Sequence, residues 1–223
     1  MDAMNVIRVL VAALLVAGCA SAQNPPAAAP RHLVYLHGRI VQEQQSRRPR
    51  HLEHGYYELD EIAAALRKRG FVVSAKLRPK DATVSGAADA VVQQVRQLMR
   101  SGVPADRITV VGASMGAGIA FRVAARLQEP DVRFALLGPC LSVGAPAVAA
   151  EEGTYPSGRL LSIREESDVP SSDCPAWTGG GPDAAHLRGR ELVLETGLGH
   201  GFLYRPLPEW LEPVLEWAGG DEN

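Results

Sequence analysis

The sequence predicts an α/β protein with a mostly parallel central sheet that is covered by helices on both faces. Short apolar runs alternate with amphipathic stretches along most of the 223 residues. The apolar runs are nearly continuous, which is typical of strands buried on both faces. Stretches of helical length separate them, as parallel pairing requires. A chain of this length can form one domain with a single sizeable core.

Six segments are expected to form the strands of this sheet. Each is short, rich in aliphatic residues and followed by a turn or a helical pattern. Ligands of parallel sheets bind beyond the carboxyl ends of the strands, near the topological switch point. The residues that directly follow each strand are therefore the candidates for function. In chain order the strands span residues 32–37, 71–77, 107–112, 132–138, 159–164 and 190–196.

Helical periodicity marks the segments between these strands. Residues 57–70 place Leu59, Ile62 and Leu66 on one face and stop at Gly70, as amphipathic helices ending in glycine do. The same spacing of apolar residues predicts helices over residues 85–102, 115–128 and 207–217.

The overall charge is small. A net charge of −2 and a pI near 6.3 give no reason to expect binding to nucleic acid or to an anionic membrane surface. No Cys/His spacing is typical of zinc, so neither a metal nor a cofactor is expected. His51 and His54 are interpreted as solvated loop histidines, with a metal-binding pair as the alternative.

The beginning of the chain predicts export rather than part of the fold. Arg8 precedes an apolar run over residues 9–17. This run is too short to anchor a spanning helix, but it has the length of the hydrophobic core of a signal peptide. Cleavage of an ordinary signal peptide near residues 20–22 is one interpretation.

The run ends in Val-Ala-Gly-Cys, at residues 16–19. This motif resembles the lipobox of bacterial lipoprotein signal peptides. The resemblance implies a signal peptide over residues 1–18 and a lipid on Cys19. With Ala20 after the cysteine, it also implies the periplasmic face of the outer membrane, if the organism has one.

Residues 19–30 are rich in proline and alanine and are expected to be a linker that holds the domain, residues 31–219, away from the membrane. If Cys19 carries lipid, Cys140 and Cys174 remain. Two cysteines in an oxidising compartment favour a disulfide between them. Two buried thiols are the alternative.

Three side chains with complementary chemistry follow three different strands. Ser114 lies in the turn Gly-Ala-Ser-Met-Gly, at residues 112–116, between a buried strand and a helix. Asp168 follows the fifth strand and His200 the last. A serine hydroxyl needs a neighbouring imidazole to take its proton, and the imidazole needs a carboxylate to orient it. The alternative is that this turn only allows the strand and the helix to pack closely. A phosphate-binding turn is disfavoured, because the sequence here lacks the lysine of a P-loop.

The G-x-S-x-G turn and the chain order Ser, Asp, His resemble the α/β-hydrolase fold over residues 31–219. The resemblance implies Ser114 as nucleophile, His200 as general base and Asp168 as the orienting acid. Asp173, five residues further on, is the rival for the acid.

The same resemblance implies an oxyanion hole. Its first donor is the backbone N–H of Met115, which follows the nucleophile. The second comes from the loop after the first strand, at Gly38 or Arg39.

Weaker candidates for substrate contacts lie nearby. Arg78 and Tyr56 are expected near the site because of their positions relative to strand ends, and Trp177 because it follows the strand of the acid. Only eighteen residues separate Cys140 from Arg159, so no large lid domain fits there. An open site suits small-molecule or envelope-polymer acyl substrates.

These observations predict an extracytoplasmic serine hydrolase that cleaves an ester, thioester or amide through an acyl-enzyme. A carboxylic-ester hydrolase is the first expectation, and a peptidase or an acyltransferase the next. The alternative is a non-catalytic envelope lipoprotein that retains the fold as a binding or assembly module. Geometry discriminates between them, because an enzyme needs His200 within hydrogen-bond reach of both Ser114 and Asp168.

Overall fold

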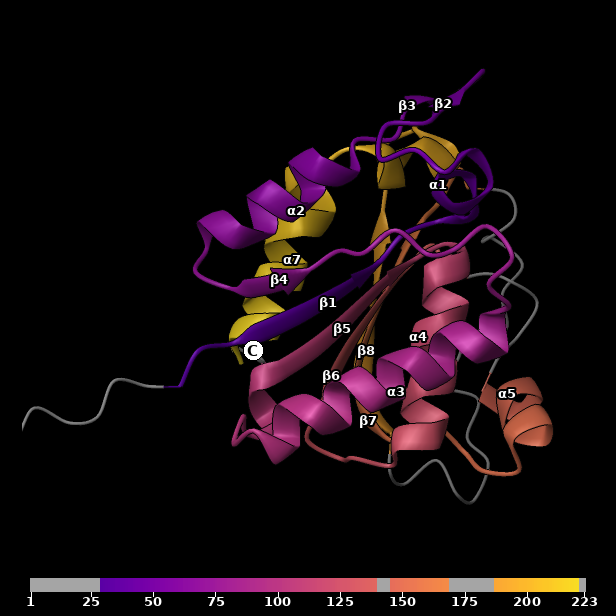
Figure 1. Cartoon of the computed structure of the whole chain (residues 1–223). Coiled ribbons are helices and arrows are strands. Elements are labelled where there is room, and N and C mark those ends of the chain that lie inside the picture. Colours follow the sequence, from indigo (N-terminus) through magenta and orange to yellow (C-terminus); the bar gives the residue numbers. More distant parts are fainter. Residues whose placement is uncertain (1–28, 140–144, 169–186, 221–223) are drawn as a thin grey trace, which may run out of the picture.

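A six-stranded parallel sheet forms the centre of the molecule (Figure 1). The computed structural model describes residues 29–139, 145–168 and 187–220. The sheet has the order β4-β1-β5-β6-β7-β8, which confirms the predicted fold class. Its strands are β1 (His32–Leu36), β4 (Val72–Ser74), β5 (Ile108–Ala113), β6 (Arg133–Leu137), β7 (Gly158–Glu165) and β8 (Leu187–Leu194).

The strand order reverses direction between β1 and β5. From β1 the chain moves outward to the edge strand β4, returns across β1 to β5, and then continues to β8 on the other side. The carboxyl ends of β1 and β5 therefore flank the topological switch point, where ligands of such sheets bind.

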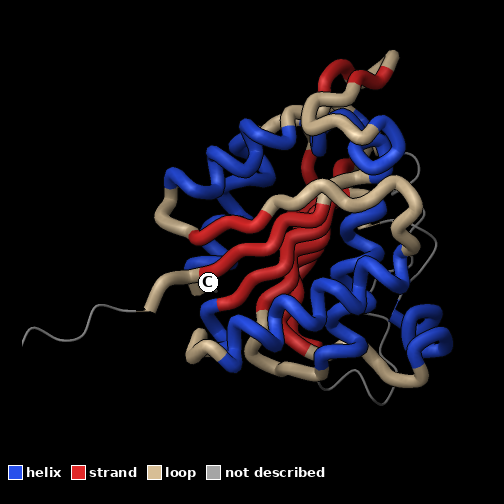
Figure 2. Tube along the Cα trace, viewed as in Figure 1, coloured by secondary structure: helices blue, strands red, loops and turns tan. Residues whose placement is uncertain are grey.

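Helices cover both faces of the sheet, as predicted (Figures 1 and 2). Alternate residues of β1 serve the two faces: Leu33 and Tyr35 belong to one apolar cluster, and Val34 and Leu36 to the other. This is the two-residue period of a strand that is buried on both sides. The helices are α2 (Leu59–Lys68) and α7 (Pro208–Gly219) on the first face, and α3 (Val84–Arg100) and α4 (Met115–Leu127) on the second.

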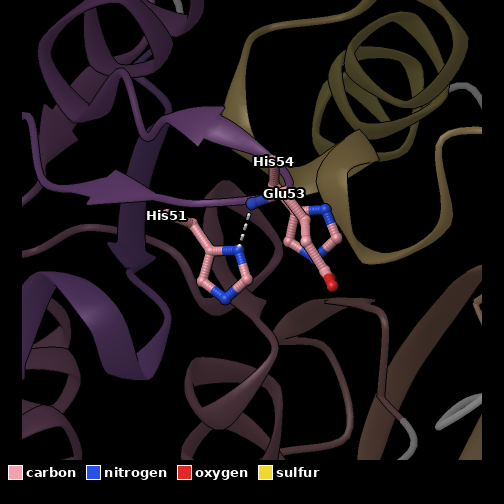
Figure 3. A group of neighbouring side chains, drawn as sticks. All are labelled: His51, Glu53 and His54. Atoms are coloured by element: carbon pink, nitrogen blue, oxygen red, sulfur yellow. Dashed lines mark hydrogen bonds between the residues drawn. The ribbon is translucent and has the colours of Figure 1, made fainter.

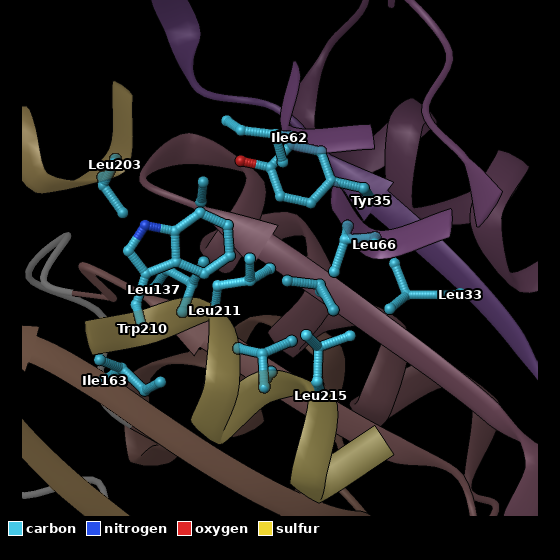
Figure 4. Close-up of a cluster of buried hydrophobic side chains, with 14 of the residues drawn as sticks. Leu33, Tyr35, Ile62, Leu66, Leu137, Ile163, Leu203, Trp210, Leu211 and Leu215 are labelled. Carbon is cyan, nitrogen blue, oxygen red and sulfur yellow. The ribbon is translucent and has the colours of Figure 1, made fainter. Parts of the chain in front are cut away.

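The first cluster includes Trp210 of α7 (Figure 4). Its indole is fully buried, and the indole N–H donates to the carbonyl of Arg205 at 3.0 Å. The indole N–H of a buried tryptophan usually has such a partner. This cluster extends to Leu203, so it supports the segment that carries His200.

Several short elements were not predicted. His51 and His54 were expected in a loop and residues 57–70 in a helix, but β2 (Arg50–His51) and β3 (Gly55–Tyr56) pair as an antiparallel hairpin, and α2 begins only at Leu59. Two-residue strands give no alternation to detect. The other unpredicted elements are α1 (Arg39–Gln44), α5 (Ala145–Glu152) and the 3₁₀ segments at Ala105–Arg107 and Gly199–Tyr204.

The edge strand is shorter than predicted. β4 pairs with β1 only through Val72, Val73 and Ser74, whereas residues 71–77 were expected to be extended. An edge strand has one partner, so its carboxyl end is free to leave the sheet. It does so here and carries Arg78 beneath the loop after β1.

Several predictions fall outside the described residues. They concern the signal peptide, the lipidated Cys19, the Cys140–Cys174 disulfide, the rival acid Asp173 and the pocket residue Trp177. Among the residues that are described, no helix combines the length and the apolar character needed to cross a membrane.

Candidate active site

Ser114 occupies a strained corner between β5 and α4. Its backbone angles are φ 54° and ψ −118°, which a residue with a side chain rarely adopts and which cost about 1–3 kcal/mol. The corner is held on both sides, because the Ser114 N–H donates to the carbonyl of Leu137 and the Ala117 N–H donates to the carbonyl of Ser114, both at 2.8 Å. This conformation directs the serine side chain out of the sheet edge.

The two flanking glycines make this corner sterically possible. A Cβ atom on Gly112 would overlap the carbonyl of Gly116 one turn later, and a Cβ atom on Gly116 would overlap the carbonyl of Leu36 in β1. Both neighbours are backbone atoms, which cannot rotate away as a side chain can. The glycines therefore serve close packing, and this packing fixes the position of Ser114.

Ser114, His200 and Asp168 form a hydrogen-bonded chain. The Ser114 Oγ lies 2.9 Å from His200 Nε2, and His200 Nδ1 lies 2.8 Å from Asp168 Oδ2. The carboxylate can only accept, so Nδ1 carries the proton and Nε2 accepts from the serine hydroxyl. Asp168 is 1% exposed, whereas His200 is partly open to solvent. The arrangement can move a proton from the serine to the imidazole and stabilise the resulting imidazolium.

A buried carboxylate joins the two loops that carry Asp168 and His200. Glu165 ends β7 and is fully buried. It accepts from the Ser167 hydroxyl at 2.5 Å and from the backbone N–H groups of Thr196 and Gly197 at 3.1 and 3.0 Å. The Ser167 hydroxyl in turn accepts from the Gly199 N–H at 3.0 Å. The acid and the histidine are thus aligned by one shared network.

The sequence analysis missed Glu165, although the pattern contained a signal. Leu161 and Ile163 lie on the same face of β7, and the two-residue period of a strand places Glu165 on that face as well. A carboxylate at a buried strand position needs several donors. Such a residue next to a candidate catalytic acid is therefore a candidate positioning residue.

The loop after β1 lies against Ser114. A Cβ atom on Gly38 would be 3.6 Å from the Ser114 Cβ, so the backbone of this loop reaches the place where an oxyanion hole is expected. Two side chains beneath the loop, His37 and Arg78, are buried.

Arg78 binds the underside of this loop instead of facing the pocket of Ser114. Its guanidinium donates to the carbonyl of His37 at 2.5 Å and to Gln42 Oε1 at 2.9 Å. The Arg78 backbone N–H donates to His37 Nε2 at 3.1 Å. The His37 Nδ1–H therefore donates to the Gly38 carbonyl, 2.9 Å away. Every one of these contacts orients the loop and not a substrate.

Burial shifts the pKa values of these groups. Burial, followed by the neighbouring Arg78 charge, lowers the pKa of His37 to about 4, so this imidazole is neutral at pH 7. Burial also lowers the pKa of Arg78 to about 10 and raises that of Tyr57 to about 12. The Tyr57 hydroxyl bonds that of Tyr35 at 2.7 Å.

A cavity of about 700 Å³ opens over Ser114 and His200. Tyr57, Leu203 and Tyr204 provide apolar wall, while the outer rim carries charged side chains. Its lining also includes Arg39, Ile40, Glu43, Gln44 and the hairpin residues Arg50, His51, Leu52 and Glu53. Tyr57 lines this cavity and Tyr56 does not. The Tyr56 ring is half-exposed and lies under the Arg48 guanidinium.

One group of side chains near the cavity could hold a metal ion. Ligand atoms of His51, Glu53 and His54 lie within 4.8 Å of one another. The two histidines were interpreted as loop residues, but the β2–β3 hairpin brings them together in a stack (Figure 3).

Comparisons with known proteins find similarity in structure only. No family model and no curated protein matches the sequence. SOBER1 of Arabidopsis thaliana superposes with a TM-score of 0.56 at 11% identity, covering 87% of this chain and all of that one. A hyperthermophilic esterase from the archaeon Pyrobaculum calidifontis superposes with a TM-score of 0.52 at 21% identity, covering 86% and 75%.

A third structural match names the fold class. A protein of unknown function from Agrobacterium tumefaciens, assigned to the α/β hydrolases, superposes with a TM-score of 0.50 at 16% identity, covering 86% of this chain and 85% of that one. Together with the parallel sheet and the strained serine corner, these matches show that the chain has the α/β-hydrolase fold.

Proposed function

We propose that this protein is a serine hydrolase that cleaves a carboxylic ester through an acyl-enzyme on Ser114. The observation that carries the proposal is the hydrogen-bonded chain from Ser114 through His200 to Asp168, with both distances under 3 Å. This geometry supports an enzyme over a non-catalytic module with the same fold.

The proposed reaction has two halves. Ser114 Oγ attacks the substrate carbonyl while its proton passes to His200 Nε2. The imidazolium, stabilised by Asp168, then gives this proton to the leaving alcohol as the C–O bond breaks. In the second half His200 takes a proton from water, the resulting hydroxide attacks the acyl-enzyme, and the acid is released as Ser114 recovers its proton.

Two backbone N–H groups are proposed to stabilise the oxyanion. Met115 is the first residue of α4, so its N–H has no partner within the helix and lies at the positive end of the helix dipole. The second donor is proposed to come from the loop after β1, at Gly38 or Arg39, because the backbone of this loop lies against Ser114.

The cavity supports a small acyl substrate with some polar character. An apolar inner wall at Tyr57 and Leu203 suits an acyl group, and a charged rim suits a polar leaving group. The likeness to an esterase from Pyrobaculum calidifontis agrees with an ester in preference to an amide. A peptidase or an acyltransferase would require a different leaving group or acceptor at the same site.

We further propose that the protein is exported and anchored by lipid on Cys19, with Cys140 and Cys174 joined in a disulfide. The support is the signal-like sequence before residue 20 and the oxidising compartment that export implies. Cys19→Ser should release the protein from membranes. Alkylation of Cys140 or Cys174 without reductant would contradict the disulfide.

Labelling with a fluorophosphonate probe tests the hydrolase directly. The wild-type chain should be labelled and Ser114→Ala should not. Ser101→Ala, which removes an exposed serine at the end of α3, is the matched control and should be labelled like wild type. An unlabelled wild-type chain, or equal labelling of Ser114→Ala, would exclude Ser114 as the nucleophile.

A further inference from the structure

We propose that the β2–β3 hairpin binds one divalent transition-metal ion, with Zn²⁺ as the representative, across the mouth of the cavity that contains Ser114. The ligands are the imidazoles of His51 and His54 and the carboxylate of Glu53. Binding of the ion does not depend on the proposed hydrolase activity, whereas its effect on catalysis does.

The hairpin brings the three ligands together through its backbone. His51 pairs with Gly55 and Arg50 pairs with Tyr56, which closes a short turn between His51 and Gly55. The left-handed backbone of Gly55, with φ 76°, suits a tight turn of this kind. Three ligands within four consecutive residues therefore lose little further chain entropy when an ion binds.

The side chains already converge. The two imidazole rings are stacked with centroids 4.5 Å apart and planes within 11° of parallel, and Glu53 lies beside them (Figure 3). Zinc–nitrogen bonds of about 2.1 Å place tetrahedral ligands about 3.4 Å apart. The ligand atoms lie within 4.8 Å of one another, so their separations must close by at most about 1.4 Å, and rotation of partly exposed side chains can supply that.

The present hydrogen bonds do not resist this closure strongly. The Glu53 backbone N–H donates to His51 Nδ1 at 3.3 Å, which is long for such a bond. An ion bound at Nδ1 of His51 occupies the acceptor of this bond. An ion bound at Nε2 leaves the proton on Nδ1, which can then no longer accept.

The donor set selects the class of ion. Two imidazoles and one carboxylate suit Zn²⁺, Cu²⁺ or Ni²⁺, whereas Mg²⁺ and Ca²⁺ prefer oxygen ligands. Three protein ligands also leave a coordination position open to water or to an acyl substrate oxygen.

The location of the site gives the ion an effect on access to Ser114. His51 and Glu53 line the same cavity as Ser114 and His200. The His54 ring lies 6.4 Å from the His200 ring and packs over Gly201. An ion in this position narrows the mouth and holds the hairpin against the segment that carries His200. We therefore expect Zn²⁺ to slow the reaction at Ser114.

Calorimetric titration of the chain with ZnCl₂ tests the binding, using protein without an added histidine tag. One saturable site is expected, with no site for MgCl₂. His51→Gln and His54→Gln should each weaken Zn²⁺ binding by about 10–100-fold, at least as much as the loss of an outer-shell partner does. Glu53→Gln should fall between these variants and wild type. His32→Gln, at the start of β1, is the matched control and should bind like wild type.

Fluorophosphonate labelling with and without ZnCl₂ tests the position of the ion. Labelling should slow with Zn²⁺ in wild type and in His32→Gln, but not in His51→Gln or His54→Gln. The proposal is overturned if no saturable site exists, if the hairpin variants bind Zn²⁺ unchanged, or if bound Zn²⁺ leaves labelling unaltered. A chain that is never labelled contradicts the hydrolase instead, and calorimetry still decides on the ion.

Discussion

A Cβ atom added to Gly116 would overlap the carbonyl oxygen of Leu36. The first turn of α4 thus lies against the last residue of β1, and this contact sets the distance between Ser114, the proposed nucleophile, and the loop that is proposed to bind the oxyanion. Backbone packing therefore fixes the position of Ser114 relative to the loop after β1.

Gly116→Ala should therefore lower both stability and activity. The added methyl group must push α4 away from β1, and overpacking of this kind costs about 1–3 kcal/mol or more. Thermal unfolding and fluorophosphonate labelling measure the two effects. Gly86→Ala in α3 is the control, because its new methyl group meets only the Thr83 hydroxyl oxygen, at 3.2 Å. Equal melting temperatures for Gly116→Ala and wild type would contradict the steric argument.

Asp168→Asn should leave the fold intact and lower kcat by about 10⁴-fold, as loss of the orienting carboxylate does in a Ser-His-Asp triad. The asparagine amide can donate to His200 Nδ1, which favours the tautomer with its proton on Nε2, facing Ser114. Hydrolysis of a small ester measures the effect. Asp173→Asn should retain activity, and a reversal of the two results would make Asp173 the acid.

Arg78→Met should lower kcat by about tenfold or more with little change in KM. The variant leaves the carbonyl of His37 and the side chain of Gln42 without their donor, at a cost of about 1–3 kcal/mol for each buried group. Arg78→Lys should recover part of the activity. Arg47→Met, which removes an exposed ion pair to Asp60, is the control. A lower melting temperature with unchanged kcat would limit Arg78 to a structural role.

The buried His37 should make the protein less stable in mild acid. Its pKa is about 4 in the folded state and about 6.5 when unfolded. Between these values the unfolded chain binds a proton that the folded chain does not. The free energy of unfolding should thus fall as the pH drops from 6.5 towards 4, by up to about 3 kcal/mol.

Urea unfolding at pH 7 and pH 4.5 measures this dependence. His37→Asn keeps a donor to the Gly38 carbonyl but cannot titrate, so its stability should change less between the two pH values. His32→Gln, at the start of β1, controls for the loss of an imidazole at another position. Identical pH dependence in His37→Asn and wild type would show that other groups cause the acid sensitivity.

Much of the fold could be predicted because it depends on long periodic segments. The alternation of Leu33 and Val34 and the helical spacing of Leu59 and Ile62 are strong local signals. The positions after the strand ends then singled out the residues that the structure brings together. Asp168 and His200 are 32 residues apart in the chain, yet parallel strands with a common direction place them at one edge.

The rest depends on contacts that a local pattern cannot show. Arg78 was predicted to contact a substrate, because a residue that follows a strand end lies near the site. Its side chain instead turns under the loop and donates to the carbonyl of His37, some 40 residues away in the chain. A local sequence pattern does not contain this contact. His51 and His54 were likewise brought into a stack by a hairpin whose strands are too short to be recognised in the sequence.

The network around Glu165 has a consequence for how such a protein can diversify. It fixes Asp168 from the amino-terminal side, through β7 and the Ser167 hydroxyl, and it fixes His200 from the end of β8. Glu165 and the Ser167 hydroxyl serve both loops, so a change at either residue would disturb the acid and the histidine together. Substitutions that alter substrate preference are therefore expected among the residues that line the cavity and not within this network.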